Sequence, residues 1–166
     1  MKYLIDSNCF IEPKNTMCPL DVAISFWSKI KSLIDQQDIF VLDKVVTELG
    51  EIEDRLKNWI HSNIDRGQIL KFENECSISQ FKSISLWAST NPQYTKSAKD
   101  KFLDASRADV FLVSYASTSP SEWTVVTQEK PAPYKQSEIK LPDACAHFGI
   151  HCVSLLDMFR EMGETY

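Results

Sequence analysis

The sequence lacks the features that would place it in a membrane or in a disulfide framework. No apolar run among its 166 residues approaches the roughly 18 needed to cross a bilayer. The chain does not open with a basic start and a long apolar stretch, so a cytoplasmic location is expected. Its five cysteines form no C-x-x-C pair, and their odd number argues against complete disulfide pairing.

Two cysteines and two histidines near the C-terminus do not follow a familiar metal-binding pattern. Cys145, His147, His151 and Cys152 form C-x-H-x-x-x-H-C, which is not a known spacing of zinc ligands. We interpret them as residues that line a short helix and the strand after it. All five cysteines are expected to be reduced and mostly structural.

The chain also lacks an excess of basic residues. Its formal net charge is −5, the wrong sign for a protein that grips nucleic acid with a broad basic surface. Nucleic acid stays open as a substrate, because the carboxylates of a metal site add to the negative count. Bound divalent cations would reverse the potential around such carboxylates.

What the sequence does contain is the composition of an ordinary globular protein, with 43% hydrophobic and 25% charged residues. We find no internal repeat, low-complexity tract or linker. A chain of 166 residues is long enough to bury most of its core. We therefore expect a single domain over residues 1–166.

Short apolar runs alternate with stretches of helical periodicity along the chain. We expect strands at 2–6, 39–42, 123–127 and 152–153, and an extended piece at 69–72. Residues 7–19, with two prolines, are expected to form a loop. Helices are expected at about 20–36, at 44–49, from beyond Gly50 to Gly67, at 78–90, 95–103, 106–117 and 143–148, and at the C-terminus. Asp43 is expected to cap the second of these, and Val22 and Ile52 are expected on the apolar faces of the first and third. This alternation predicts a three-layer α/β/α sandwich with a central, mostly parallel sheet, whose ligands bind beyond the carboxyl ends of the strands.

Asp6 lies at the end of the first predicted strand, after Tyr3-Leu4-Ile5 and before Ser7-Asn8. Burying even a neutral polar group without a partner costs about 2–7 kcal/mol, and a carboxylate costs more. A partner charge or a metal ion is the usual compensation. Asp6 is therefore a candidate functional residue.

Two further carboxylates, Glu48 and Asp109, lie on apolar helical stripes. The stripes comprise Val45, Glu48, Leu49 and Ile52 in one helix and Asp109, Leu112, Val113 and Ala116 in the other. Taken singly, Asp109 could be a helix N-terminal acid, which gains about 0.3–1 kcal/mol, and Glu48 could pair with Lys44 or an arginine. Three inward carboxylates at one edge of the sheet favour a joint function instead.

Oxygen ligands without histidine or cysteine suit Mg²⁺ or Mn²⁺. Two such ions about 3.5–4 Å apart activate a water and stabilise the leaving oxygen in phosphodiester cleavage. Without metal the carboxylates repel one another, so at least one is expected to take up a proton or the site to loosen.

Four segments of the chain resemble the motifs of PIN domains, in the order of that family. They are Leu4-Ile5-Asp6-Ser7-Asn8, Val45-Val46-Thr47-Glu48-Leu49, Ala108-Asp109-Val110-Phe111-Leu112-Val113 and Val125-Val126-Thr127-Gln128-Glu129. The segments Lys130-Pro131-Ala132 and Leu141-Pro142-Asp143-Ala144-Cys145 are similar to an uncharacterised PIN-like subfamily, whose members are often taken to be toxins of toxin–antitoxin pairs.

The resemblance implies a metal-dependent endoribonuclease with Asp6, Glu48 and Asp109 as its catalytic metal ligands and Mg²⁺ or Mn²⁺ as its cofactor. It implies RNA as the substrate and a cognate antitoxin as the partner of a type II toxin. A homodimer is an open alternative for its assembly, and no membrane association is implied.

The fourth acidic position departs from the family pattern, in which Thr-x-Asp is usual. Glu129 stands there and is expected to reach a second metal through water, and Asp143 either replaces it or caps the helix after Pro142. Asp104 is expected to act as a cap or as a secondary contributor. We expect Ser7, Asn8 and Thr127 to hold the ligands in place, with ordinary turn or cap roles as the alternative.

The substrate side is predicted from a loop that should border the site. Lys130 and Lys135 can contact phosphates and Tyr134 can stack on a base. Lys140 lies in the same loop, and Lys96, Lys99, Lys101 and Arg107 lead into the Asp109 helix. A solvated charged face is the alternative for both groups. Trp27, Trp59 and Trp87 are expected to be packing residues.

Three other functions compete with the nuclease. A haloacid-type phosphatase needs a second aspartate where the chain has Asn8, and a response-regulator domain needs adjacent acids near its start. A PIN-like module that binds RNA or protein without cutting is the alternative that the negative charge and Glu129 favour.

Overall fold

The computed structural model describes residues 2–51, 55–73 and 75–166, and within them five strands form one parallel sheet. Its order is β3-β2-β1-β4-β5, and each neighbouring pair runs parallel. The strands are β1 (Lys2–Ile5), β2 (Ile39–Leu42), β3 (Ile69–Leu70), β4 (Trp123–Val126) and β5 (His151–Val153). The predicted parallel sheet is confirmed.

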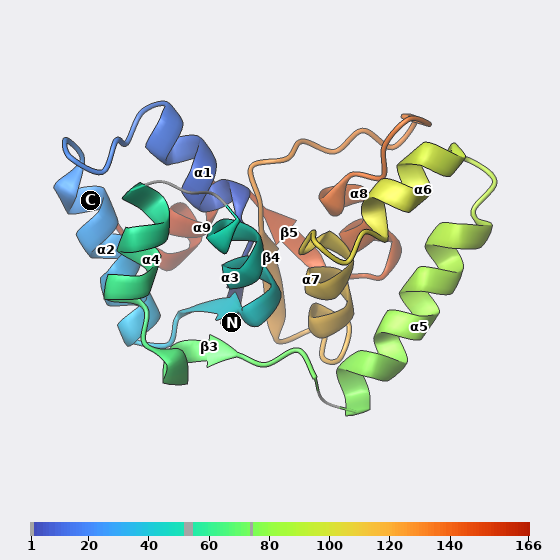
Figure 1. Cartoon of the computed structure of the whole chain (residues 1–166), viewed down its shortest axis with the longest axis horizontal. Helices are drawn as coiled ribbons and strands as arrows, with labels where there is room; N and C mark the ends of the chain where they lie inside the picture. Colours follow the sequence, from blue (N-terminus) through green and yellow to red (C-terminus); the bar gives the residue numbers. More distant parts are fainter. Residues whose placement is uncertain (1, 52–54, 74) are drawn as a thin grey trace.

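Helices cover both faces of this sheet, which confirms the three-layer α/β/α architecture (Figure 1). One layer holds α1 (Asn8–Asn15), α2 (Ile24–Asp35), α3 (Asp43–Gly50), α4 (Arg55–Asn63) and α9 (Leu155–Met162). The other holds α5 (Glu75–Thr90), α6 (Lys96–Phe102), α7 (Asp109–Ala116) and α8 (Leu141–His147). A 3-10 turn, η1 (Arg66–Gln68), precedes β3. In the part of the chain that is described, no helix is long and apolar enough to cross a membrane.

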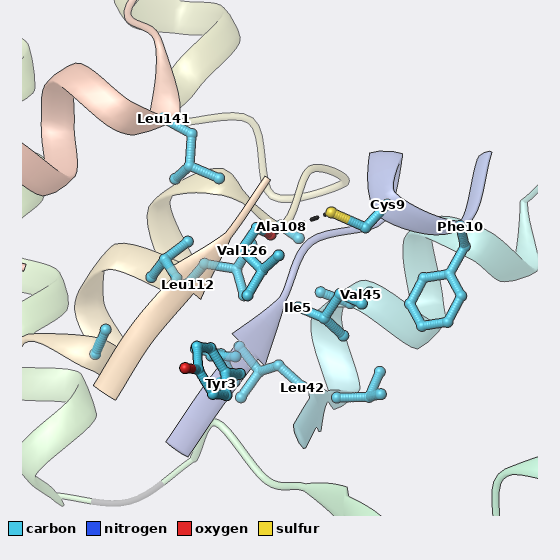
Figure 2. Close-up of a cluster of buried hydrophobic side chains, with 14 of the residues drawn as sticks. Tyr3, Ile5, Cys9, Phe10, Leu42, Val45, Ala108, Leu112, Val126 and Leu141 are labelled. Atoms are coloured by element: carbon cyan, nitrogen blue, oxygen red, sulfur yellow. Dashed lines mark hydrogen bonds between the residues drawn. The ribbon is translucent and has the colours of Figure 1, made fainter. Parts of the chain in front are cut away.

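The core explains why the strands are apolar without alternation. All four residues of β4 are buried, because helices cover both of its faces. Figure 2 shows side chains from helices on both faces gathered around the central strands, among them Val45 from α3, Leu112 from α7 and Leu141 from α8. The Cys9 thiol lies here too, 3.4 Å from the carbonyl oxygen of Val126.

The strand order switches direction between β1 and β4. The chain moves outward from β1 to β2 and β3 and then returns to the other side of β1 as β4. Such a switch of direction opens a ligand-binding crevice in parallel sheets. Asp6 and Thr127 are the residues directly after these two strands, and the Asp6 N–H donates to the Val126 carbonyl at 2.9 Å.

The loop predicted at residues 7–19 is wrong in its first half, where the structure has helix α1. Pro13 suggested a break, yet it lies in the last turn of this helix, where its missing N–H removes a single hydrogen bond. Burial of Cys9 and Phe10 stabilises the turn before it.

The helix predicted at 20–36 begins later, at Ile24. The residues before it form a turn in which the Val22 N–H donates to the Pro19 carbonyl at 3.1 Å. Val22 was expected on the apolar face, but its side chain is 76% exposed. The helix predicted from apolar periodicity was therefore too long at its N-terminal end.

Other predicted helix boundaries also differ from the observed ones. Asp43 was expected to cap α3, but it is the first residue of the helix and its carboxylate accepts from the Phe72 N–H at 3.2 Å. The helix expected up to Gly67 ends at Asn63, and Ile52, placed on its apolar face, lies outside the described residues. The helix expected from residue 106 begins at Asp109.

Candidate functional site

Asp6 lies where the strand order switches direction and is almost fully buried, with 2% of its surface exposed. One carboxylate oxygen accepts from the Ser7 N–H at 2.7 Å, and the other accepts from the Thr127 hydroxyl at 2.9 Å. Among the described residues no lysine, arginine or histidine forms an ion pair with it. The polar contacts orient this carboxylate, but they do not neutralise its charge.

Asn8 and Thr127 tie the ends of β1 and β4 together around Asp6. The Asn8 amide donates to the Thr127 hydroxyl at 3.0 Å and accepts from the Gln128 N–H at 2.9 Å. The Thr127 hydroxyl also accepts from the Glu129 N–H at 3.2 Å. The structure thus places Ser7, Asn8 and Thr127 beside Asp6 in positions that fix its orientation.

Glu48 and Asp109 come to Asp6 from the two helical layers. A carboxylate oxygen of Glu48, on α3, accepts from the N–H of Ala108 at 3.1 Å, directly before α7. Asp109 is the first residue of α7, and its side chain is 13% exposed. The contact of Glu48 with Ala108 joins the two layers above the sheet edge.

The charges of these acids act on one another. Burial raises the pKa of Asp6 well above its ordinary value, the charges of Asp109 and Glu48 raise it further, and the Thr127 hydroxyl opposes them. Burial likewise raises the pKa of Asp109 from 3.8 to about 6, with Arg107 opposing and Glu129 and Glu48 adding to the rise. Burial first, and the charges of the neighbouring acids second, thus favour the protonated form of Asp6 and Asp109.

Arg107 lies beside these acids, although the sequence suggested a phosphate contact or a solvated charged face for it. Its Nε and Nη2 both lie 3.2 Å from one carboxylate oxygen of Asp109. Burial lowers its pKa, but the charges of Asp109, Glu48 and Glu129 outweigh this and raise it. The only sequence signal is its place two residues before Asp109, which does not tell whether it turns inward.

Of the two candidates for a fourth acid, Glu129 is the one whose charge raises the pKa of Asp109. The charge of Glu129 acts on Asp109, while its oxygens accept from the Leu141 N–H at 2.9 Å and from Lys140 at 3.3 Å. The carboxylate of Asp143 instead accepts from the Ala132 N–H, at 3.1 and 3.0 Å.

The other two acids in doubt have local roles. Asp143 was expected, as one alternative, to cap α8, but it lies in the first turn of that helix. That interpretation is wrong, because its carboxylate holds the preceding loop. Asp104 accepts from the Ser106 N–H at 2.9 Å and from its hydroxyl at 2.8 Å, so it stabilises the turn that leads to α7.

The donors fit a divalent cation in their chemistry more than in their spacing. All are carboxylate oxygens, the ligands of Mg²⁺ and Mn²⁺. Yet within residues 2–51, 55–73 and 75–166 no group of three or more acidic, histidine or cysteine side chains is close enough to hold a metal. Arg107 already neutralises part of the negative charge through its ion pair with Asp109. A metal ion would therefore have to compete with Arg107 and bring the carboxylates closer together.

Of the residues predicted to contact a substrate, Tyr134 is exposed, whereas Lys135 is engaged in an ion pair. Tyr134 is 94% exposed. Lys135 pairs with Glu138 at 2.7 Å, and Lys101 and Lys140 pair with the same carboxylate. This pairing explains much of the loop's basic character as local structure.

A hollow of about 680 Å³ lies beside the carboxyl ends of β4 and β5, and Lys130 lines it. Four carboxylates and two cations line it in all, namely Glu12, Glu129, Asp157, Glu161, Lys130 and Arg160. We name it the acidic hollow.

The histidines and cysteines near the C-terminus have separate roles, and the four described cysteines are free thiols. His147 stacks on Trp87 with ring centroids 4.8 Å apart, and His151 lies 3.1 Å from Glu161. Cys145 is buried beside Cys152, whose proximity and the burial raise its pKa. The structural interpretation of this segment therefore holds. The side chain of Cys76 lies outside the described part of the chain.

Residues 3–166 match a protein family whose description is "Domain of unknown function (DUF4411)", and the chain belongs to this family. No curated protein and no solved structure matches the chain.

Proposed function

We propose that this protein is a metal-dependent endoribonuclease that hydrolyses RNA phosphodiester bonds with Mg²⁺ or Mn²⁺. The observation that carries the proposal is the carboxylate of Asp6. It lies buried at the carboxyl end of β1, without an ion-pair partner among the described residues, and within reach of the charges of Asp109 and Glu48. A fold gains no stability from such a group, so a function is the better explanation.

The metal would be held by Asp6, Glu48 and Asp109, with Glu129 near a second position. When bound, such a cation neutralises the carboxylates, lowers the pKa of a water molecule and balances charge on the phosphate. The protein's own residues position the ligands: Thr127 and Ser7 orient Asp6, and the Ala108 N–H orients Glu48.

Arg107 is proposed to keep the acids together until a metal arrives. Its guanidinium holds Asp109 at 3.2 Å and feels the charges of Glu48 and Glu129. A divalent cation at this point would compete with it for the carboxylates. The released guanidinium would then be free to contact a substrate phosphate.

The resemblance of the motifs to PIN domains supports RNA as the substrate and extends the proposal to the toxin of a toxin–antitoxin pair. A cognate antitoxin is the partner that this extension requires. It rests on the motifs alone, and co-purification of a small partner with the tagged protein tests it.

A binding module without catalysis is the second candidate. Two observations favour it: no three-carboxylate group is close enough for a metal in the part of the chain that is described, and Glu129 is tied to Lys140 and the Leu141 N–H. Such a module would bind RNA or protein and would not need a cation.

The test is cleavage of structured and single-stranded RNAs by the purified protein in Mn²⁺ and in EDTA. Asp6→Asn is the variant and Asp143→Asn the matched control, because Asp143 serves the nearby loop. We expect cleavage that needs Mn²⁺, disappears in Asp6→Asn and persists in the control. Equal cleavage by Asp6→Asn would reveal a contaminant, and no cleavage by any form would favour the binding module.

A further inference from the structure

We refer to Asp6, Glu48 and Asp109 as the acidic cluster. A groove of about 700 Å³ lies on a different side of α3 from this cluster. It is bounded by the first turn of α3, the second half of α4 and the edge strand β3. Thr47 lines it, while the next residue, Glu48, belongs to the acids. Because consecutive helical residues point about 100° apart, this one helix separates two neighbouring sites. We name this feature the basic groove.

Three basic side chains line the basic groove, each from a different element. They are His61 of α4, Arg66 of η1 and Lys71 directly after β3. None of them forms an ion pair with another described residue. The one acid among the described lining residues, Asp43, is held by the Phe72 N–H at 3.2 Å. Arg66 and Lys71 therefore outnumber the single described acid of the groove, although the chain as a whole has a net charge of −5.

The groove also has apolar lining. Ile60 of α4 and Ile64, directly after α4, are buried there, while Val46 of α3 and Ile69 of β3 are half-buried. Cations beside the half-buried Val46 and Ile69 complement a nucleotide, since the phosphate meets the charges and the base or sugar covers these two side chains. The volume is within the range of small-molecule sites.

We propose that the basic groove binds a segment of a single-stranded nucleic acid whose scissile bond lies at the acidic cluster. This inference rests on the proposed function. A strand that passes the acidic cluster can continue toward β5 or across α3. Toward β5 it meets the acidic hollow, whose four carboxylates outnumber its two cations, whereas across α3 it meets Arg66 and Lys71.

The test is the binding of a fluorescently labelled RNA of twelve uridines, followed by anisotropy in EDTA so that no cutting occurs. Arg66→Ala with Lys71→Ala is the variant. Lys2→Ala with Lys82→Ala is the control, because it removes the same charge from exposed positions at the start of β1 and on α5. Two lost phosphate contacts should weaken binding on the order of tenfold and reduce the slope of log K against log salt by about 1.4. Equal denaturation midpoints confirm that both double variants fold.

Three results would overturn the inference: no binding by the wild type, an equal loss in variant and control, or no loss in the variant. Inorganic phosphate or adenosine monophosphate that binds the groove as tightly as the oligonucleotide would also overturn it, since the site would then suit a small anion. Groove-dependent binding by a protein that never cuts RNA supports the inference and removes the nuclease, so the two proposals fail separately.

Discussion

Replacing Asp109 by asparagine is expected to stabilise the metal-free protein at neutral pH. Its carboxyl group has its pKa raised from 3.8 to about 6 in the folded protein, chiefly by burial. A raised pKa means that the folded state binds more protons than the unfolded state between these two values. Stability therefore falls as the pH rises through this window and stays lower above it.

The size of the effect follows from the pKa. A rise of about 2 units corresponds to about 3 kcal/mol at pH 7, since each unit is about 1.4 kcal/mol. The pKa of about 6 already contains the attraction of Arg107 for the carboxylate. The gain of about 3 kcal/mol should therefore raise the melting temperature by roughly 6–12 °C for a chain of this length.

The assay is urea denaturation in EDTA between pH 4 and pH 8, with Asp100→Asn as the control on an exposed face of α6. The advantage of Asp109→Asn should be present at pH 7 and shrink as the pH falls toward 4. Equal midpoints for variant and wild type at pH 7, or an advantage that does not change with pH, would refute the reasoning.

Two further predictions concern the neighbours of these acids. Arg107→Ala should tighten Mn²⁺ binding several-fold, because it removes a competing cation from Asp109; calorimetric titration measures this, and weaker binding would show that Arg107 shapes the site instead. Thr127→Val should cost about 1–2 kcal/mol in urea denaturation, because Asp6 loses the hydroxyl that donates to it at 2.9 Å. Thr127→Ser keeps that donor and should restore stability; an equal loss in both would point to packing.

The sheet could be predicted from the sequence because its signals are local. Buried parallel strands appear in a sequence as short, largely apolar runs, and Ile39–Leu42 and Trp123–Val126 are runs of this kind. Helix α1 could not be predicted, because its stability comes from burying Phe10 against the rest of the core, while Pro13 argues locally against it.

The acidic cluster was partly predictable for a related reason. Helical periodicity predicted that Glu48 and Asp109 point inward, and the end of the first strand predicted Asp6 near them. The charges of both residues do act on Asp6. Arg107 was not predictable, because the turn before α7 decides where it points. The basic groove was hidden, since Arg66 and Lys71 meet only after β3 packs beside α3 and α4.

The most direct measurement is a calorimetric titration of the metal-free protein with Mn²⁺, beside Asp6→Asn. The account predicts saturable binding by the wild type, with proton release at pH 6 because Asp6 and Asp109 have raised pKa values. It predicts no such binding by the variant. Equal binding by both proteins, or none by the wild type, would contradict the claim that these acids form a metal site.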